Sequence, residues 1–189
     1  MGIAEKLAKK YNVKLSEESQ RELSLVLDRN VYPKGEIILN QNAVCTDIYI
    51  VEEGIVRQFY YKDGRDVTEH FSCEGDVVFS IESLFLREPT VLLMEALEES
   101  VIYQLNYRKF QQLCDQNIDI NVLYRRIVES DLIVSQRKAD SWRFENSRER
   151  YLRFCKEYPE VAYRAPVAHI ATYLLMTPET LSRIRSGTL

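Results

Sequence analysis

The stretch 164–185, RAPVAHIATYLLMTPETLSRIR, constrains the fold more than any other part of the chain. Its apolar residues recur at helical spacing on both sides of a Thr-Pro-Glu break, which predicts two short helices joined by a tight turn. Thr177 can cap the second helix with its hydroxyl, and Pro178 suits the first helical position because the N–H that it lacks has no partner there. The stretch therefore predicts a helix-turn-helix, although Leu175 or Met176 stands where the turn usually has a glycine.

A helix-turn-helix of this kind places its second helix in the major groove of DNA. The early exposed side chains of that helix include a carboxylate, which can accept from cytosine N4, and a guanidinium, which can bond guanine O6 and N7. The predicted DNA-contacting residues are Pro178, Glu179, Thr180, Ser182, Arg183 and Arg185, together with His169 on the first helix. The alternative is an ordinary helical hairpin, because short paired helices are common.

The charge distribution agrees with a DNA-binding C-terminal part. The whole chain has a net charge of −4, but residues 143–189 carry eight basic and five acidic side chains, whereas residues 1–142 carry 17 and 24. A basic end on an acidic body is typical of a DNA-reading module attached to a sensory or assembly domain. The excess of three positive charges is small and has little weight by itself.

Length and composition are those of a globular protein, since 189 residues suffice for one large or two modest domains. No apolar run is long enough to span a membrane and no basic-then-apolar leader opens the chain, so we expect a cytoplasmic protein without membrane contact. The cysteines form no C-x-x-C pair, which favours reduced thiols over a zinc site or a disulfide framework. They are Cys45, Cys73, Cys114 and Cys155.

Residues 1–29 have apolar side chains at helical spacing and are predicted to be helical. Beyond them, β-branched and aromatic runs separated by turn residues predict short strands, which in such close succession form an antiparallel roll or barrel. The expected strands are 36–39, 47–51, 54–61, 67–71, 76–79, 90–96 and 101–105. Hairpin turns are predicted at 52–54 and 62–65, the second because its Asp-Gly pair adopts positive φ easily.

Helical spacing returns at residue 106. Asn106 is predicted to cap a short helix, and Asn117 or Asp119 to open a much longer one that reaches about residue 141. A capping box formed by Asn146 with Glu149 then opens the helix that leads into the helix-turn-helix.

The long helix has one apolar stripe, which Asp131 interrupts, and a second partial stripe. Two partly apolar faces favour packing on the roll on one side and on a partner helix on the other. The residues assigned to this dimer helix are Ile120, Tyr124, Ile127, Leu132 and Val134. A helix buried wholly within one chain is the alternative.

Taken in order, these segments resemble the cyclic-AMP receptor/FNR (Crp/Fnr) family of bacterial transcription regulators. The segments that carry the resemblance are Pro33-Lys-Gly-Glu36, Asp47-Ile-Tyr-Ile-Val-Glu-Glu-Gly54, Gly75-Asp76, Asn106-Tyr-Arg-Lys-Phe110 and Thr177-Pro-Glu-Thr-Leu-Ser-Arg-Ile184. Single segments are weak signals, but their order and spacing over nearly the whole chain are fairly specific.

The resemblance implies an α+β fold in three parts. These are an N-terminal antiparallel β-roll of the cyclic-nucleotide-binding jelly-roll type at 1–115, a dimerisation helix and hinge at 116–145, and a helix-turn-helix DNA-binding domain at 146–189 with a truncated or absent wing. It further implies a homodimer that reads a two-fold operator in double-stranded DNA and works with RNA polymerase. Glu179 and Arg183 match the family's base-contacting residues, whereas Pro178 replaces a family arginine.

The sensor departs from the family's cyclic-AMP-binding members, in which a glutamate after Gly-Asp binds the ribose and an Arg-Ser pair some ten residues on binds the phosphate. Aligned from Gly75-Asp76, Ser80 stands at the glutamate and Pro89-Thr90 at the Arg-Ser pair. A cyclic phosphate in a half-buried pocket needs a cation or several backbone donors, and proline supplies neither, so cyclic AMP is not expected. Arg87, two residues before Pro89, is the alternative cation for a phosphate. The pocket predicted for an unidentified effector comprises Ser80, Ile81, Glu82, Pro89, Thr90, Tyr124 and Val128.

No cofactor is expected. An iron–sulfur cluster of the family's oxygen-sensing branch needs cysteines near the N-terminus, but none precedes Cys45. His70 and Cys73 would point to opposite faces of a strand, which disfavours haem or metal ligation. An enzyme is not expected either, because the sequence has no Gly-x-Ser-x-Gly, no phosphate-binding glycine loop and no histidine beside a plausible nucleophile.

Two functions remain from the sequence. The first is a transcription regulator in which an effector biases the hinge at 142–147 and thereby reorients two recognition helices. The second is an effector-binding regulatory module that acts through protein partners instead of DNA. A steep fall of DNA affinity with salt would distinguish the first from the second.

Overall fold

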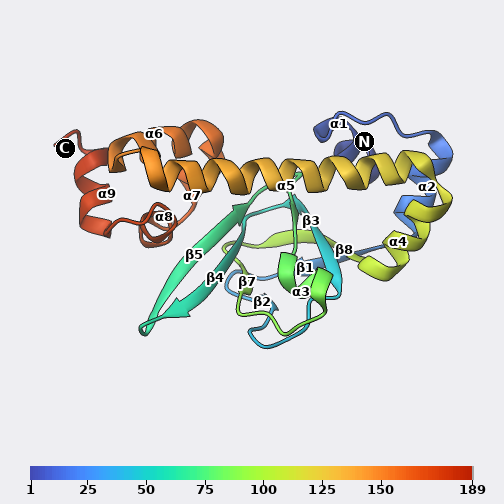
Figure 1. The fold of residues 1–189 in the computed structure, drawn as a ribbon, viewed down its shortest axis with the longest axis horizontal. Coiled ribbons are helices and arrows are strands. Elements are labelled where there is room, and N and C mark those ends of the chain that lie inside the picture. Colours follow the sequence, from blue (N-terminus) through green and yellow to red (C-terminus); the bar gives the residue numbers. More distant parts are fainter. Residues whose placement is uncertain (189) are drawn as a thin grey trace.

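The computed structural model describes residues 1–188 (Figure 1). Two antiparallel sheets form a roll beneath one long helix, which connects a helical N-terminal end to a cluster of C-terminal helices. The helices are α1 Ile3–Lys10, α2 Glu17–Leu25, α3 Ile81–Leu86, α4 Tyr107–Gln116, α5 Ile118–Phe144, α6 Ser147–Glu157, α7 Pro159–Arg164, α8 Val167–Tyr173 and α9 Pro178–Arg185. The strands are β1 Leu27–Tyr32, β2 Ile37–Leu39, β3 Asp47–Glu53, β4 Val56–Lys62, β5 Arg65–Ser72, β6 Val77–Val78, β7 Leu93–Ala96 and β8 Ser100–Asn106.

The two sheets have the strand orders β1-β8-β3-β6 and β2-β7-β4-β5. Apolar side chains of the roll share one core with helices α1, α2, α4 and α5, so the helices complete the roll instead of forming a separate layer. The most deeply buried members of this core include Leu7, Leu23, Ile48, Ile50, Ile102, Phe110, Ile120 and Leu123. Among residues 1–188, no helix is both long enough and apolar enough to cross a membrane.

One of the two predicted hairpin turns is confirmed and the other is wrong. β4 and β5 pair from Val56↔Ser72 to Lys62↔Arg65, and the Asp63-Gly64 pair between them has positive φ at both residues. The segment 52–54 joins β3 to β4, which lie in different sheets, so the chain crosses between sheets there. Gly54 is required at this crossing because a Cβ would collide with Ser100.

The prediction of helix through residue 29 is wrong at its end. α2 stops at Leu25, and Leu27 starts a strand that pairs with β8 from Leu27↔Leu105 to Tyr32↔Ser100. Strand pairing with residues more than 65 positions away overrides the local apolar spacing, which includes Leu27 by chance. The short helix α3 was not predicted either.

The predicted helix starts are confirmed because capping depends on neighbouring residues alone. Asn106 accepts from the Lys109 amide over 3.3 Å and caps α4. The side chain of Asn117 likewise caps α5, which runs to Phe144, a little beyond the predicted end. Asn146 and Glu149 form the capping box of α6.

The helix-turn-helix is formed by α8 and α9. Thr177 accepts from the Thr180 amide over 3.2 Å, and Pro178 is the first residue of α9, both as predicted. Leu175 adopts φ 53°, the left-handed conformation that glycine usually supplies in this turn. The motif therefore forms with a residue that strains the turn, at a position where the leucine side chain is exposed.

The dimer-helix assignment is partly wrong. Ile120 is 0% and Ile127 is 3% exposed, since both face the core of their own chain, and they are unavailable to a partner. Tyr124 is turned inward as well, with its hydroxyl 2.8 Å from that of Tyr107 on α4. Leu132 and the unpredicted Ile133 are 70% and 50% exposed and lie on the outer face of α5.

Candidate functional site

The recognition-helix candidate α9 lies at the end of the molecule, on the far side of the C-terminal helices from the roll (Figure 1). Its inner face is anchored by Leu181 and Ile184, which are buried. Four of the predicted DNA-contacting side chains on it are exposed, namely Glu179, Ser182, Arg183 and Arg185. Pro178 is exposed too, and Thr180 is half-buried with its hydroxyl 3.1 Å from that of Thr177.

The Glu179 carboxylate in the first turn of α9 lies within electrostatic range of the Arg183 guanidinium in its last turn. Hydrogen bonds from its own backbone N–H and from Thr177, and the charge of Arg183, lower the pKa of Glu179. The Glu179 carboxyl is therefore ionised at neutral pH, and the side chains of Glu179 and Arg183 both face solvent, as base readout requires.

His169, predicted to contact DNA, faces the roll instead. Its Nδ1 lies 2.6 Å from a guanidinium nitrogen of Arg57 on β4. Burial and the charge of Arg57 lower the pKa of His169, so the imidazole is neutral and accepts the hydrogen bond through Nδ1. In this conformation His169 is a contact between α8 and the roll, so its side chain is not directed outward as the predicted DNA contact requires.

Arg57 is the centre of a polar cluster that joins the roll to α8. It is only 3% exposed, and it donates to Asp66 over 2.5 Å and to Glu95 over 2.6 Å. The hydroxyl of Thr172 on α8 extends the contact, because it accepts from the Thr68 backbone amide over 3.1 Å. Together these bonds hold α8 against the β4–β5 hairpin.

A second polar contact joins the C-terminal helices to the segments that follow β5 and β7. Arg164 on α7 donates through two nitrogens to the two carboxylate oxygens of Glu74, over 2.8 and 3.1 Å, and also binds Glu98. Hydrogen bonds to Glu74 and Glu98 raise the pKa of Arg164 further. This forked geometry fixes the direction of approach as well as the distance between the two parts.

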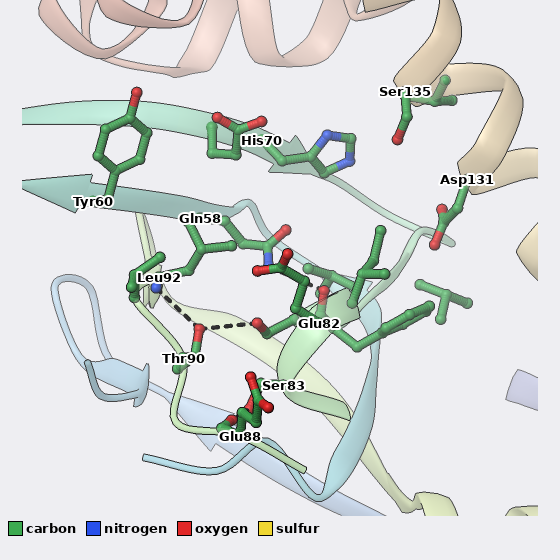
Figure 2. A pocket seen from close by; sticks show the side chains of 18 of the residues that line it. Gln58, Tyr60, His70, Glu82, Ser83, Glu88, Thr90, Leu92, Asp131 and Ser135 are labelled. Atoms are coloured by element: carbon green, nitrogen blue, oxygen red, sulfur yellow. Dashed lines mark hydrogen bonds between the residues drawn. The ribbon is translucent and has the colours of Figure 1, made fainter. Parts of the chain in front are cut away.

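A cavity of about 450 Å³ opens between the roll and α5 (Figure 2). β4 and β5 contribute Gln58, Tyr60, Glu69 and His70, the segment 77–83 contributes β6 and the start of α3, and residues 88–92 close another side. α5 contributes Asp131, Val134, Ser135 and Lys138. The cavity therefore contacts both the roll and the helix that leads to the C-terminal helices.

The predicted effector residues near α3 line this cavity, namely Ser80, Ile81, Glu82, Pro89 and Thr90. Tyr124 and Val128 are not among the lining residues, so the predicted contact with α5 lies one to two turns too early on that helix. Sequence reasoning missed the actual α5 contributors. The signal was present, because Asp131 interrupts the apolar stripe at the place where the helix passes over the cavity.

The cavity does not fit a cyclic phosphate. The hydroxyls of Ser80 and Thr90 lie 2.9 Å apart, and the Thr90 hydroxyl also accepts from the Leu92 amide over 3.0 Å (Figure 2). Arg87, the open substitute for the phosphate-binding arginine, is exposed at the end of α3 and is not part of the lining. The groups at the expected phosphate position are thus bonded to one another, and none of the described lining residues is an arginine.

The ionisable groups of the cavity have strongly shifted pKa values. Burial and the nearby Asp76 raise the pKa of Asp131 to about 7. Burial and the charge of Lys138 lower the pKa of His70 to about 4, so its imidazole is neutral. Burial lowers the pKa of Lys138, although Glu69, 2.7 Å away, opposes that change. Shifted pKa values in a cavity are typical of binding sites.

Asp131→Asn is expected to change the pH dependence of stability. Because the folded state holds the Asp131 proton to about pH 7 while the unfolded chain loses it near pH 4, this carboxyl favours the folded state at low pH. That contribution is lost as the pH rises through this window. Between pH 5 and pH 8 the wild-type chain should therefore lose about 2–3 kcal/mol more than the variant in urea denaturation.

The matched control is Asp115→Asn, which removes an exposed carboxyl at the end of α4. This variant should keep the wild-type difference between the two pH values. Equal losses for the wild-type chain and Asp131→Asn would show that Asp131 is ionised in the folded state throughout this range.

We also searched for groups of side chains that could hold a metal ion. Among residues 1–188, no three or more His, Cys, Asp or Glu side chains are placed to hold one ion. His70 lines the cavity on β5, whereas Cys73 follows the end of that strand and is not part of the lining.

Comparisons with known proteins agree with this architecture. A family model described as the cyclic nucleotide-binding domain matches residues 29–117. FixK2 from Bradyrhizobium japonicum is 22% identical with a TM-score of 0.74, over 86% of this chain and 84% of that one. The c-di-GMP responsive global regulator CLP of Xanthomonas campestris is 15% identical with a TM-score of 0.69, over 89% of each chain.

A protein from Eubacterium rectale described as a Crp/Fnr-family transcriptional regulator is 16% identical with a TM-score of 0.67, over 92% of this chain and 83% of that one. The search of curated proteins gave no match. At these identities the solved structures establish the fold, and they confirm the α+β arrangement of roll, long helix and C-terminal helices expected from the sequence.

Proposed function

Since the chain contains a cyclic nucleotide-binding domain within the Crp/Fnr fold, we propose that it is a DNA-binding transcription regulator. The observation that carries the proposal is the surface of α9, where Glu179, Ser182, Arg183 and Arg185 are exposed together on a helix whose inner face is buried. A helix anchored in this way presents base-reading groups in a fixed orientation.

In this proposal Arg183 bonds to a guanine and Glu179 to a cytosine. Glu179 lies in the first turn of α9, the part of a recognition helix that contacts base edges, and Arg183 lies four residues later in its last turn. Pro178 has no donor to offer, so the operator preference should differ from that of regulators that have an arginine there.

The proposed regulator is a homodimer paired through α5. Leu132 is 70% and Ile133 is 50% exposed on the outer face of this helix. A second copy of α5 would cover these two apolar side chains. Two-fold pairing places two copies of α9 on the same side of the dimer, which then reads two half-sites of an operator. RNA polymerase is the expected further partner on DNA.

The proposed coupling runs from the cavity to α9 through α5 and α8. The Nζ of Lys138, which lines the cavity, also lies 4.7 Å from the Trp142 ring and 5.1 Å from the Tyr173 ring on α8. An effector that moves Lys138 would therefore change a contact of the helix-turn-helix itself. By this route binding would shift the population of C-terminal domain orientations.

Selection of bound fragments from random duplex DNA tests the function directly. We expect an inverted repeat to be enriched, with an affinity that falls steeply as salt rises, because phosphate contacts release counterions. If no duplex is retained at low ionic strength while purified protein partners bind, the chain is instead an effector-binding module that acts through proteins.

Arg183→Ala is expected to weaken binding to the selected site by about 1–3 kcal/mol and to relax base choice at one position of each half-site. The reason is the loss of two hydrogen bonds to guanine, which a neutral methyl group cannot replace. Binding titrations on the selected site and on its single-base variants measure both effects.

The matched control is Arg108→Ala, which removes an exposed arginine on α4 at the opposite end of α5. It should leave both affinity and base choice unchanged. Equal weakening of Arg183→Ala on every sequence would show that Arg183 contacts phosphate instead of a base.

A further inference from the structure

The walls of the cavity carry four carboxyl side chains against one ammonium group. The carboxyls are those of Glu69, Glu82, Glu88 and Asp131, and the ammonium is that of Lys138. The Lys138 Nζ is already engaged, because it donates to both the carboxylate and the backbone carbonyl of Glu69. An anionic ligand would therefore enter a site whose only cation among the described lining residues is paired, and would face carboxyl groups from three sides.

Gln58 supplies a hydrogen-bond acceptor to the cavity. This residue is only 6% exposed and its side chain lines the cavity (Figure 2). Its Nε2 donates to the Phe79 carbonyl over 3.1 Å, which leaves the amide oxygen for another donor. That oxygen can accept a hydrogen bond from a ligand that brings an N–H or O–H group.

The cavity also has apolar and aromatic wall residues. Tyr60, Phe79, Val91 and Leu92 contribute to the walls. A cavity of about 450 Å³ has room for a ring-containing molecule of modest size. The lining thus combines an apolar surface for a flat body with acceptors for a positively charged, hydrogen-bond-donating group.

We propose that this cavity binds an organic cation in which an ammonium group is attached to a flat apolar body. The ammonium group lies between Glu69 and Asp131 and donates to the amide oxygen of Gln58. This inference rests on the proposed function only in taking the cavity as the effector site. A cyclic phosphate, which the fold would suggest, has the opposite charge.

The same assignment explains how the ligand acts on α8. A ligand ammonium competes with Lys138 for the carboxylate of Glu69 and repels Lys138 at short range. Once released from Glu69, Lys138 no longer holds its position over the rings of Trp142 and Tyr173. Trp142 is the single tryptophan of the chain, so its fluorescence reports this step without a label.

Isothermal titration of the full chain with three probes of similar size tests the charge preference. Phenethylamine is the cation, hydrocinnamate the anion and phenethyl alcohol the neutral probe. We expect phenethylamine to bind at least about ten-fold more tightly than hydrocinnamate, with phenethyl alcohol between them, and Trp142 fluorescence to change only with the cation. Cyclic AMP should give no saturable heat.

Three results would overturn the proposal. They are tighter binding of hydrocinnamate than of phenethylamine, saturable binding of cyclic AMP, or no binding by phenethylamine at millimolar concentration. Asp131→Asn should lower the phenethylamine affinity about ten-fold or more, whereas the exposed control Asp115→Asn should not change it. Glu69→Gln should also lower that affinity, and it tests the second carboxylate independently of Asp131.

Failure here and failure of the proposed function give different results. If the cation preference is absent but random-duplex selection yields an operator, the regulator stands and its effector has another charge. If the cation binds and no duplex is retained, the ligand assignment stands and the output is not DNA binding.

Discussion

Phe71→Ala is expected to lower the free energy of unfolding by about 3–5 kcal/mol, the usual cost of emptying a buried phenylalanine site. Phe71 lies on β5 and is 1% exposed, with its ring centroid 5.4 Å from that of Tyr173 and 6.1 Å from that of Phe154. Tyr173 and Phe154 belong to the C-terminal helices. The substitution therefore leaves a cavity at the boundary between the roll and these helices.

Because the lost contacts cross this boundary, Phe71→Ala should also uncouple the two parts. In urea, the fluorescence of Trp142 should change at a lower midpoint than far-ultraviolet circular dichroism, which follows the whole chain. The matched control is Phe110→Ala, since Phe110 is equally buried but packs only in the core of the roll. Phe110→Ala should lose a similar free energy of unfolding, but its fluorescence and circular dichroism should change at the same urea concentration. If the two signals also change together in Phe71→Ala, the two parts are not uncoupled.

Arg57→Met should destabilise the chain by about 3 kcal/mol, near the lower end of the range for breaking a buried ion pair. The substitution keeps most of the aliphatic stem but leaves Glu95, whose side chain is 16% exposed, without its cation. The loss is limited because the Asp66 side chain is 40% exposed and can be hydrated. His169 also loses its donor, so α8 should separate from the hairpin more readily.

The triple variant Arg57→Met, Asp66→Asn, Glu95→Gln separates charge from packing. If the uncompensated carboxylates cause the loss, the triple variant should recover most of the stability in urea denaturation, since a neutral cluster has no unpaired charge. Persistent destabilisation of the triple variant would show that the geometry of the guanidinium, including its position 4.1 Å above the Phe59 ring, is what stabilises the contact.

Features set by neighbouring residues were predicted well. The caps at Asn106, Asn146 and Thr177 and the hairpin at Asp63-Gly64 depend on side chains and backbone conformations within a few positions of each other. The segment near α3 that the resemblance assigned to an effector pocket lines the cavity.

Features that depend on distant contacts were predicted poorly. Leu27 continues a helical stripe in sequence but belongs to β1, because β8 offers a strand partner. Ile127 fits a dimer stripe as well as a core stripe, and periodicity cannot distinguish the two. His169 is half-polar and stands on the first helix of the DNA-binding motif, so only the approach of Arg57, 112 residues away, reveals that it faces the roll.

The sequence by itself determined the order of the elements, the helix-turn-helix, and the serine and proline that stand at positions 80 and 89 instead of the glutamate and arginine of the cyclic-AMP-binding relatives. Those properties follow from short-range spacing and from the identity of single residues. Only the tertiary structure decided the charge of the cavity, because Asp131 and Lys138 reach it from α5, and their positions depend on how that helix packs on the roll. Long-range packing brings together groups that no local pattern relates.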